Sequence, residues 1–273
     1  MSRRIRLLGV SAIVAGVVGA AIPVSASARP VITMSGSTSV APLASLLARA
    51  YLHQYPGRVK FRLAQGGSDV GVADVAAGRV TIGNSSRDAK SSDPGGLVFN
   101  KIAKDAICIV TNPANPIADL SQATIQAIFS GQVRNWQDVP GSSRTGSINL
   151  IVRTAASGTQ DAFQKIFMGS TTVSSAASAK ASNGLIQQTV QSDPNAVGYV
   201  SLDFVRGTTP AAYKGIACNL RNAKSGEYGG VRNFWMVTRG RPRARSAVQK
   251  FIYWIQNSAR AQRIVGTHWV PLR

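Results

Sequence analysis

Apolar positions between residues 29 and 90 form three short runs, and each run is followed by a turn of small polar residues. The first run begins VIT at 31–33 and ends in a Gly-Ser turn, after which a helix is predicted. One face of that helix is apolar and is made by Val40, Leu43, Leu47, Ala50 and Tyr51. Strand, turn and helix recur over 59–78 with the turn QGGSD, and a third strand from 80 runs into the turn SSR at 85–87. Such turns meet at the carboxyl edge of an α/β sheet, where ligands bind.

The pattern changes after residue 101, where the chain is predicted to cross into a second lobe. The strand in DAICIVTNPANP at 105–116 is ended by two Asn-Pro pairs. Later segments predict helices over 121–131, from Gln160 and over 182–194, and strands over 148–153 and 195–205, the last of which can cross back. A final helix over 246–257 carries the apolar face Val248, Phe251, Ile252 and Ile255. The Ser/Ala-rich tract at 170–182 is predicted to be a surface loop.

The first 28 residues are typical of a secretory signal. Arg3, Arg4 and Arg6 precede an apolar run over 7–24, and ASA at 26–28 supplies the small residues of a cleavage site. Glycines and a proline interrupt the run, which disfavours an uncleaved membrane anchor. We therefore expect cleavage after Ala28 and export to the periplasm, cell envelope or exterior.

The chain is strongly basic, with 31 Lys and Arg against 11 Asp and Glu and a formal net charge of +20. Removal of the three signal arginines lowers that charge to +17. A basic surface attracts nucleic acid, anionic lipid or small anions, and composition does not choose among them. The charges are scattered along the sequence, with the densest run RGRPRAR at 239–245, which favours a general positive field over a nucleic-acid stripe.

The two cysteines, Cys108 and Cys218, lie far apart in the sequence. In an oxidising compartment they fit one disulfide, and two buried free thiols fit equally well. His53 and His268 are the only histidines, and there is no Cys/His cluster. We therefore expect no zinc site and no cofactor.

The segment RTAASGTQDAF at 153–163 joins an arginine to a triplet of small residues ahead of a helix. A helix N-terminus carries unpaired N–H donors and a partial positive charge, so Ser157, Gly158 and Thr159 beside Arg153 suit an anion. Taken alone, a capped helix with a surface arginine explains the same residues.

Seven motifs occur in a fixed order along the chain. They are SGSTSVAPL at 35–43, QGGSDVG at 65–71, IGNSSRDAK at 82–90, IFSGQVRNW at 128–136, RTAASGTQDAF at 153–163, SNGLIQQTV with NAVGYVSL ending at 202, and the closing KFIYWIQNSARAQRIVGTHWVPL. Together they resemble the PstS-like phosphate-binding proteins of the ABC phosphate-uptake system, a branch of the periplasmic solute-binding proteins. In the block 128–136 we expect Phe129 and Trp136 to be core residues.

The resemblance implies an α/β protein with a two-lobed periplasmic-binding-protein-like (type II) fold. Each lobe would be a mixed sheet flanked by helices, and hinge strands would join the lobes. The expected division is a signal peptide at 1–28, lobe 1 at 29–110, lobe 2 at 111–205 and a return segment of lobe 1 at 206–273. The implied function is that of a monomeric receptor, not an enzyme, which captures inorganic phosphate by hinge closure and delivers it to an ABC permease.

The resemblance also implies which residues hold the ion. From lobe 1 they are Thr38, Ser39, Ser68 and Ser86, and from the facing lobe they are Arg153, Ser157, Gly158 and Thr159. Four further candidates adjoin these positions: Ser37, Arg87, Asp69 and Asp88.

One position departs from the family. Where this chain has Ser86, many members have an aspartate that accepts a hydrogen bond from the proton on phosphate and repels fully ionised sulfate. A serine hydroxyl donates or accepts, so this selection is weakened. Asp88 or Asp69 can compensate, and Arg87 can either turn inward as a second cation or stay solvated.

Other functions stay open on these residues. One is a binder of another tetrahedral oxyanion such as sulfate, and another is a basic envelope-surface or nucleic-acid binder. Aromatic residues are not interleaved with the basic run at 239–245, so recognition of nucleic acid by stacking is not expected. A serine hydrolase is not expected, because the sequence has no nucleophile-elbow motif and its two histidines leave few candidates for a base.

Overall fold

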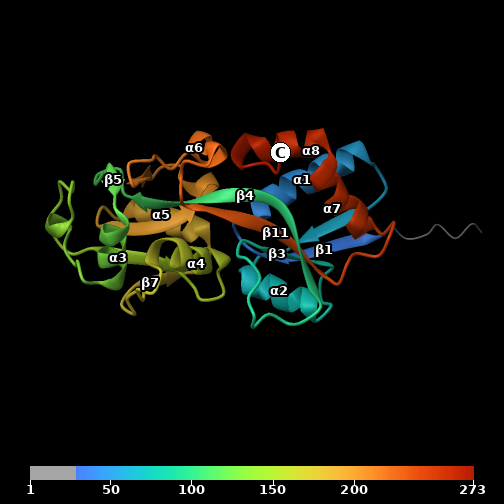
Figure 1. Cartoon of the computed structure of the whole chain (residues 1–273), viewed down its shortest axis with the longest axis horizontal. Coiled ribbons are helices and arrows are strands. Elements are labelled where there is room, and N and C mark those ends of the chain that lie inside the picture. The colour runs from blue at the N-terminus through green and yellow to red at the C-terminus, as the bar shows by residue number, and fades with distance from the viewer. Residues whose placement is uncertain (1–28) are drawn as a thin grey trace, which may run out of the picture.

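The computed structural model describes residues 29–273, and the predicted signal peptide lies outside the described residues. Two lobes lie side by side along the long axis of the molecule (Figure 1). Two long strands, β4 (Leu97–Thr111) and β11 (Val231–Arg239), run between them. Over residues 29–273, no helix combines the length and the hydropathy that a membrane crossing requires.

Lobe 1 contains three parallel strands flanked by helices on both faces. The strands are β1 (Val31–Gly36), β2 (Lys60–Leu63) and β3 (Ile82–Ser85), in the order β2-β1-β3-β11. The helices α1 (Ala41–Gln54), α7 (Ala247–Asn257) and α8 (Ala259–His268) cover one face, and α2 (Ser68–Ala76) covers the other (Figure 1). The predicted apolar faces are confirmed, because Leu43 and Leu47 of α1 and Phe251 and Ile255 of α7 are fully buried.

Lobe 2 continues the same sheet in the order β4-β8-β6-β7. Its strands are β6 (Asn149–Arg153), β7 (Ser178–Lys180) and β8 (Ala196–Ser201). Its helices are α3 (Gln122–Ser130), α4 (Gly158–Phe163), α5 (Asn183–Ser192) and α6 (Leu220–Ser225). A π-helical turn over Gln164–Met168 extends α4. Phe129 and Trp136, which we expected in the core, are fully buried there.

Two predictions about local structure are corrected. The tract 170–182 is not only loop, because β7 pairs in parallel with β6 and so adds an edge strand. After the predicted final helix, Ser258 caps a second helix, α8, by accepting a hydrogen bond from the backbone N–H of Ala261. This helix was not predicted, because its sequence is polar and contains arginines.

The strand β4 belongs to both lobes. Its residues 97–106 pair antiparallel with β11, and its residues 107–111 pair antiparallel with β8. The backbone N–H of Ile107 also donates to the carbonyl of Gly230, just before β11 begins. The chain therefore crosses between the lobes on β4 and returns on β11.

The return crossing lies later in the chain than the sequence indicated. We expected the strand over 195–205 to cross back, but β8 ends at Ser201 and stays in lobe 2. Short strands then hold the chain in lobe 2: β9 (Thr209–Pro210) pairs with β4, and β10 (Ala212–Tyr213) pairs with β5 (Asp119–Leu120). Buried residues of the expected return segment also pack in the lobe 2 core: Ala211, Tyr213, Cys218, Ala223 and Tyr228.

A disulfide joins Cys108 on β4 to Cys218, so the structure decides between the two states that the sequence left open. The two Cα atoms are 5.7 Å apart, and the bridge closes a loop with a sequence separation of 110. It fastens the segment before α6 to the crossing strand.

Removing this disulfide is expected to destabilise the protein. The double variant Cys108→Ala/Cys218→Ala should lose about 2–5 kcal/mol of unfolding free energy, because the unfolded chain regains the entropy of an open loop. Denaturant unfolding measures the loss. A reductant should lower the stability of the wild type and leave that of the double variant unchanged; equal stability of the oxidised wild type and the variant would contradict the expectation.

Candidate functional site

Three turns of lobe 1 bring serine hydroxyls together at the carboxyl ends of β1 and β3 and at the start of α2. The Oγ of Ser37 donates to the Oγ of Ser86 at 2.9 Å. The Oγ of Ser68 lies 3.3 Å from that of Ser86 and accepts from the backbone N–H of Ser86 at 3.0 Å. All three side chains are buried. The parallel pairing of β1 with β3 aligns Gly36 with Asn84, which sets the turns side by side.

Residues of lobe 2 face this cluster from the start of α4. The Oγ of Ser157 caps the helix by accepting from the backbone N–H groups of Thr159 and Gln160 at 3.1 and 3.4 Å. The Oγ1 of Thr159 lies 3.0 Å from the Oγ of Ser39, which is a hydrogen bond from one lobe to the other. The predicted triplet and the first lobe 1 turn are therefore in direct contact.

Gly158 allows the closest approach of the two lobes. A Cβ atom at this position would overlap the side chain of Ser68 and would lie 3.0 Å from the backbone nitrogen of Arg87. Nearby, the backbone N–H of Asp69 donates to the carbonyl of Ala156 at 3.1 Å. Any larger side chain at 158 would hold the lobes apart.

Arg153 lies at the end of β6 with 3 % of its surface exposed. Its Nη2 donates to the Oγ1 of Thr38 at 3.2 Å and to the carbonyl of Ala181 at 2.9 Å, and its Nε donates to the carbonyl of Lys180 at 3.2 Å. The edge strand β7 thus positions this guanidinium. Burial, with a smaller contribution from the charge of Arg232, lowers the pKa of Arg153 to about 10. Within residues 29–273, no carboxylate pairs with Arg153.

Arg232 is a second buried guanidinium, and the sequence analysis missed it. Its Nη1 donates to the Oγ1 of Thr159 at 2.8 Å, and its Nη2 donates to the Oγ of Ser39 at 2.9 Å. The residue lies on β11, where positions 232, 234 and 236 are buried. This alternation was the available signal, because it places an arginine on the inward face together with Phe234 and Met236.

Asn183 is the other missed residue. Its Nδ2 donates to the Oγ1 of Thr38 at 3.2 Å and to the Oγ of Ser39 at 2.8 Å, and its Oδ1 accepts from the backbone N–H of Ser201 at 3.1 Å. It is fully buried at the start of α5. In the sequence, an asparagine after Ser182 looks like an ordinary helix start, so no local signal set it apart.

Asp105 balances Arg232 at the crossing between the lobes. Its Oδ2 accepts from the Nε and Nη2 of Arg232 at 3.0 and 2.8 Å and from the Oγ of Ser201 at 2.8 Å. Its Oδ1 has no hydrogen-bond partner among the described residues. Burial raises the pKa of the Asp105 carboxyl, and the Arg232 guanidinium opposes that rise.

The candidates Arg87, Asp69 and Asp88 are engaged outside the hydroxyl cluster. Arg87 is neither a cation of the cluster nor solvated, because its buried guanidinium pairs with Asp69 at 2.6 Å and with Asp93 at 2.6 Å. It also lies 3.3 Å from Asp161 of lobe 2. Asp88 accepts from Asn233 and Trp235 and pairs with Lys165 at 3.6 Å. No compensating carboxylate therefore joins Ser86 from these positions.

The whole architecture matches a known family. A family model described as a PBP superfamily domain matches residues 23–259. The chain belongs to the PBP superfamily. A solved structure from Clostridium perfringens, named as a phosphate ABC transporter substrate-binding protein with bound phosphate, is 30% identical with a TM-score of 0.82. The match covers 89% of this chain and 100% of that one. The predicted two-lobed type II fold is thereby confirmed.

Further relatives confirm the PstS-like branch. An ABC-type phosphate transport receptor from Vibrio cholerae is 27% identical with a TM-score of 0.71, over 88% of this chain and 99% of that one. The phosphate-binding protein PstS of Bacillus subtilis is 26% identical over 202 residues, which are 72% of this chain and 66% of the relative. PstS of Staphylococcus aureus strain USA300 is 25% identical over 62% of this chain and 53% of its own length. The chain thus spans about half to two thirds of these curated relatives.

The lobe interface carries an excess of buried positive charge. Two buried guanidiniums face the hydroxyls of Ser39 and Thr159, and only one carboxylate, Asp105, is bonded to them among the described residues. Buried charges without partners are costly, so this interface favours an anion.

The Asp105–Arg232 pair is expected to control stability. Asp105→Ala should lower the unfolding free energy by about 3–5 kcal/mol, because it leaves a buried guanidinium without its counter-charge. The double variant Asp105→Ala/Arg232→Met should recover much of the loss. Urea unfolding in phosphate-free buffer measures both, with Asp138→Ala on an exposed turn as the control. A double variant no more stable than Asp105→Ala would contradict this account.

Proposed function

We propose that this protein is an extracytoplasmic receptor that binds inorganic phosphate between its lobes and delivers it to an ABC permease. The observation that carries the proposal is Arg153, a buried cation between the lobes with no carboxylate partner in the described chain. A tetrahedral anion would supply its counter-charge and accept its N–H groups pairwise. The names of the relatives, which are phosphate-binding proteins and receptors, support the same ligand.

The proposed ligand shell combines the residues expected from the motifs with the two that the motifs missed. It comprises Thr38, Ser39, Ser68, Ser86, Arg153, Ser157, Gly158 and Thr159, with Ser37 behind Ser86, and it adds Arg232 and Asn183. Ser157 would contribute mainly by fixing the helix start, since its Oγ already accepts two N–H groups. The hydroxyls of Ser39 and Thr159 bond to each other across the lobes, those of Ser68 and Ser86 bond within lobe 1, and each can turn its O–H group toward an anion.

Hinge closure is the proposed mechanism. The two strands that cross between the lobes, β4 and β11, can act as the hinge, and direct contacts join the lobes beside it. Besides the approach at Gly158, the Nζ of Lys90 in lobe 1 lies 2.6 Å from the Oδ2 of Asp161 in lobe 2. An ion that bridges both lobes binds only the closed form fully, so it would shift the population toward closure.

Catalysis by a serine of the cluster is not supported by the positions of the histidines. His53 contacts Arg260 at 3.5 Å, and His268 contacts Asp203 at 3.0 Å. In the described part of the chain, neither imidazole hydrogen-bonds to a serine of the cluster, so a serine there has no positioned base.

A second candidate ligand is sulfate, and Ser86 favours it. The polar neighbours of Ser86 at the interface are the hydroxyls of Ser37 and Ser68. The buried carboxylate of Asp105 at the interface is already bonded to Arg232. An ion without a proton would therefore meet donors and hydroxyls and no fixed acceptor, so sulfate should compete with phosphate.

Arg153→Ala is expected to weaken phosphate binding by at least about a hundredfold, since it removes a buried bidentate, charge-assisted contact. Isothermal titration calorimetry measures the affinity, and thermal unfolding shows whether the variant folds. The matched control is Arg134→Ala, an exposed arginine of the same lobe. A folded Arg153→Ala protein with wild-type affinity would rule out the assignment of Arg153.

Selectivity provides a separate test at Ser86. We expect sulfate to compete with phosphate in the wild type, and Ser86→Asp to lower sulfate affinity by at least about a hundredfold while monohydrogen phosphate still binds. The control Ser175→Asp adds the same charge on the surface of lobe 2. If the wild type itself excludes sulfate, another group performs the selection.

A further inference from the structure

The excess positive charge is concentrated in two segments that pack together, although it is scattered along the sequence. Residues 29–68 contain five Lys or Arg, residues 228–273 contain nine, and neither range contains an Asp or Glu. These ranges form β1, α1, β2, β11, α7 and α8, which share one core in lobe 1. Residues 69–227 contain 14 Lys or Arg and all 11 Asp and Glu, so that part is close to neutral.

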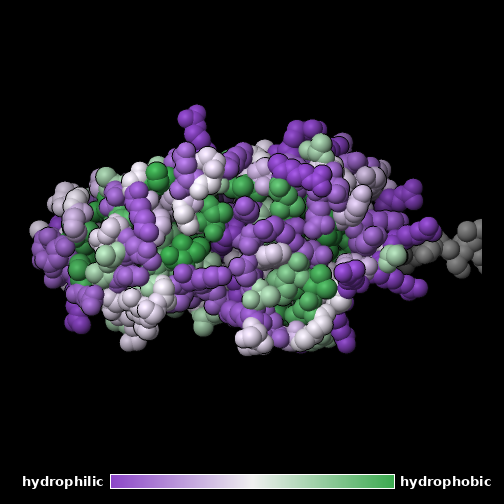
Figure 2. Space-filling model, in the orientation of Figure 1, coloured by the Kyte–Doolittle hydropathy of each residue, from purple (hydrophilic) through white to green (hydrophobic). Residues whose placement is uncertain are grey.

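The cations of this region are free to meet an external partner. Thirteen of the fourteen are exposed, and the exception is Arg232. Among the described residues, none of the thirteen forms a salt bridge. They are Arg29, Arg49, Arg58, Lys60, Arg62, Arg239, Arg241, Arg243, Arg245, Lys250, Arg260, Arg263 and Arg273. We call the part of this surface that carries Arg29, Arg58, Arg245 and Lys250 the cationic face; polar residues cover much of the visible side of this end of lobe 1 (Figure 2).

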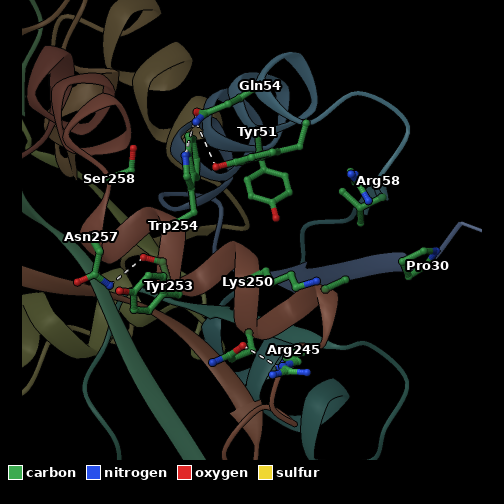
Figure 3. A pocket seen from close by; sticks show the side chains of 14 residues that line it. Pro30, Tyr51, Gln54, Arg58, Arg245, Lys250, Tyr253, Trp254, Asn257 and Ser258 are labelled. Atoms are coloured by element: carbon green, nitrogen blue, oxygen red, sulfur yellow. Dashed lines mark hydrogen bonds between the residues drawn. The ribbon is translucent and has the colours of Figure 1, made fainter.

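A groove of about 1030 Å³ opens on the cationic face between α1 and α7. Its cations are Arg58, Arg245 and Lys250, and its aromatic lining includes Tyr51, Tyr55, Tyr253 and Trp254. Figure 3 shows the three cationic side chains around the same opening as Tyr51 and Pro30. A groove of this size can hold a charged headgroup, and its exposed aromatic residues, Tyr55 and Tyr253, suit the boundary between headgroups and acyl chains.

Exposed apolar side chains accompany the charges. Of the six exposed large hydrophobic residues in the described chain, four belong to the same two segments: Val31, Tyr55, Leu63 and Tyr253. Tyr253 is 63% exposed and lines the groove. A surface that is both cationic and apolar is typical of binding to anionic lipid. Recognition of single-stranded nucleic acid by stacking is disfavoured, because the indole of Trp254 is buried and bonded to Gln54.

The start of the described chain lies at this groove. Pro30 lines it, and the guanidinium of Arg29 lies near Gly57, beside Arg58. The predicted cleavage point after Ala28 directly precedes Arg29. The described chain therefore begins on the cationic face.

From these observations we infer that the cationic face binds an anionic phospholipid surface, with a phosphate-containing headgroup seated in the groove between Arg58, Arg245 and Lys250. This contact is separate from the oxyanion site between the lobes. It would keep the receptor at the membrane that carries its permease.

Vesicle binding by the mature protein tests the inference. We expect cosedimentation with phosphatidylglycerol-containing vesicles and none with pure phosphatidylcholine. The groove variant Arg58→Gln/Arg245→Gln/Lys250→Gln should partition onto the vesicles about a hundredfold less. Each basic residue near an anionic surface raises partitioning about fivefold, and the variant lacks three. The matched control removes three exposed cations of lobe 2: Arg206→Gln/Lys214→Gln/Arg221→Gln. It should stay within about threefold of the wild type.

Two further measurements make the outcome decisive. Phosphate calorimetry should be unchanged in the groove variant, which shows that it is folded and separates this test from that of the oxyanion site. Tyr253→Ser should weaken the vesicle binding that persists at high salt, because salt screens the charge interactions and leaves the apolar contacts. Equal losses in both triple variants, no vesicle binding by the wild type, or tighter binding to duplex DNA than to vesicles at the same salt would each overturn the inference.

Discussion

The ion pair between Asp105 and Arg232 connects the parts of this molecule. Asp105 lies on β4 next to the point where that strand changes partner from β11 to β8, and Arg232 lies near the start of β11. Ser201, at the end of β8, donates to the same carboxylate. Three strands that meet at the lobe boundary are therefore joined by one buried oxygen atom. The guanidinium that neutralises it continues to Ser39 and Thr159, one from each lobe.

The two buried arginines differ in how their charges are compensated. The charge of Arg232 is compensated by the protein, so that residue can be part of the folded framework and still offer N–H groups to the interface. The charge of Arg153 has no such partner in the described chain, and the edge strand β7 only orients it through carbonyl oxygens. The protein therefore does not offset the free-energy cost of burying the Arg153 charge, and a bound anion would offset it. The proposed site therefore assigns Arg232 a part in the folded framework as well as in the ligand shell, and it assigns Arg153 to the ligand alone.

Sequence patterns predicted the parts of the site that follow strands directly. The turns with Thr38, Ser68 and Ser86 stand at the ends of short strands, and that periodicity is visible along the chain. Arg232 could have been predicted from the alternation in β11, but the strand itself was not recognised. Asn183 could not have been predicted, since its role depends on the distance of α5 from α1. The point at which the chain returns to lobe 1 was also not predictable from local patterns. Short strand pairs and a disulfide keep the chain in lobe 2 until β11, and these are tertiary contacts.

The disulfide also makes the rigidity of lobe 2 depend on the redox state of its surroundings. Cys108 lies on β4, three residues after Asp105, so the bridge to Cys218 fixes lobe 2 against the same strand that holds the interface. Thiols stay reduced inside the cell and oxidise in the compartments beyond the membrane. In reducing surroundings, packing alone would hold the segment before α6 against β4, and oxidation would add a covalent bond between them.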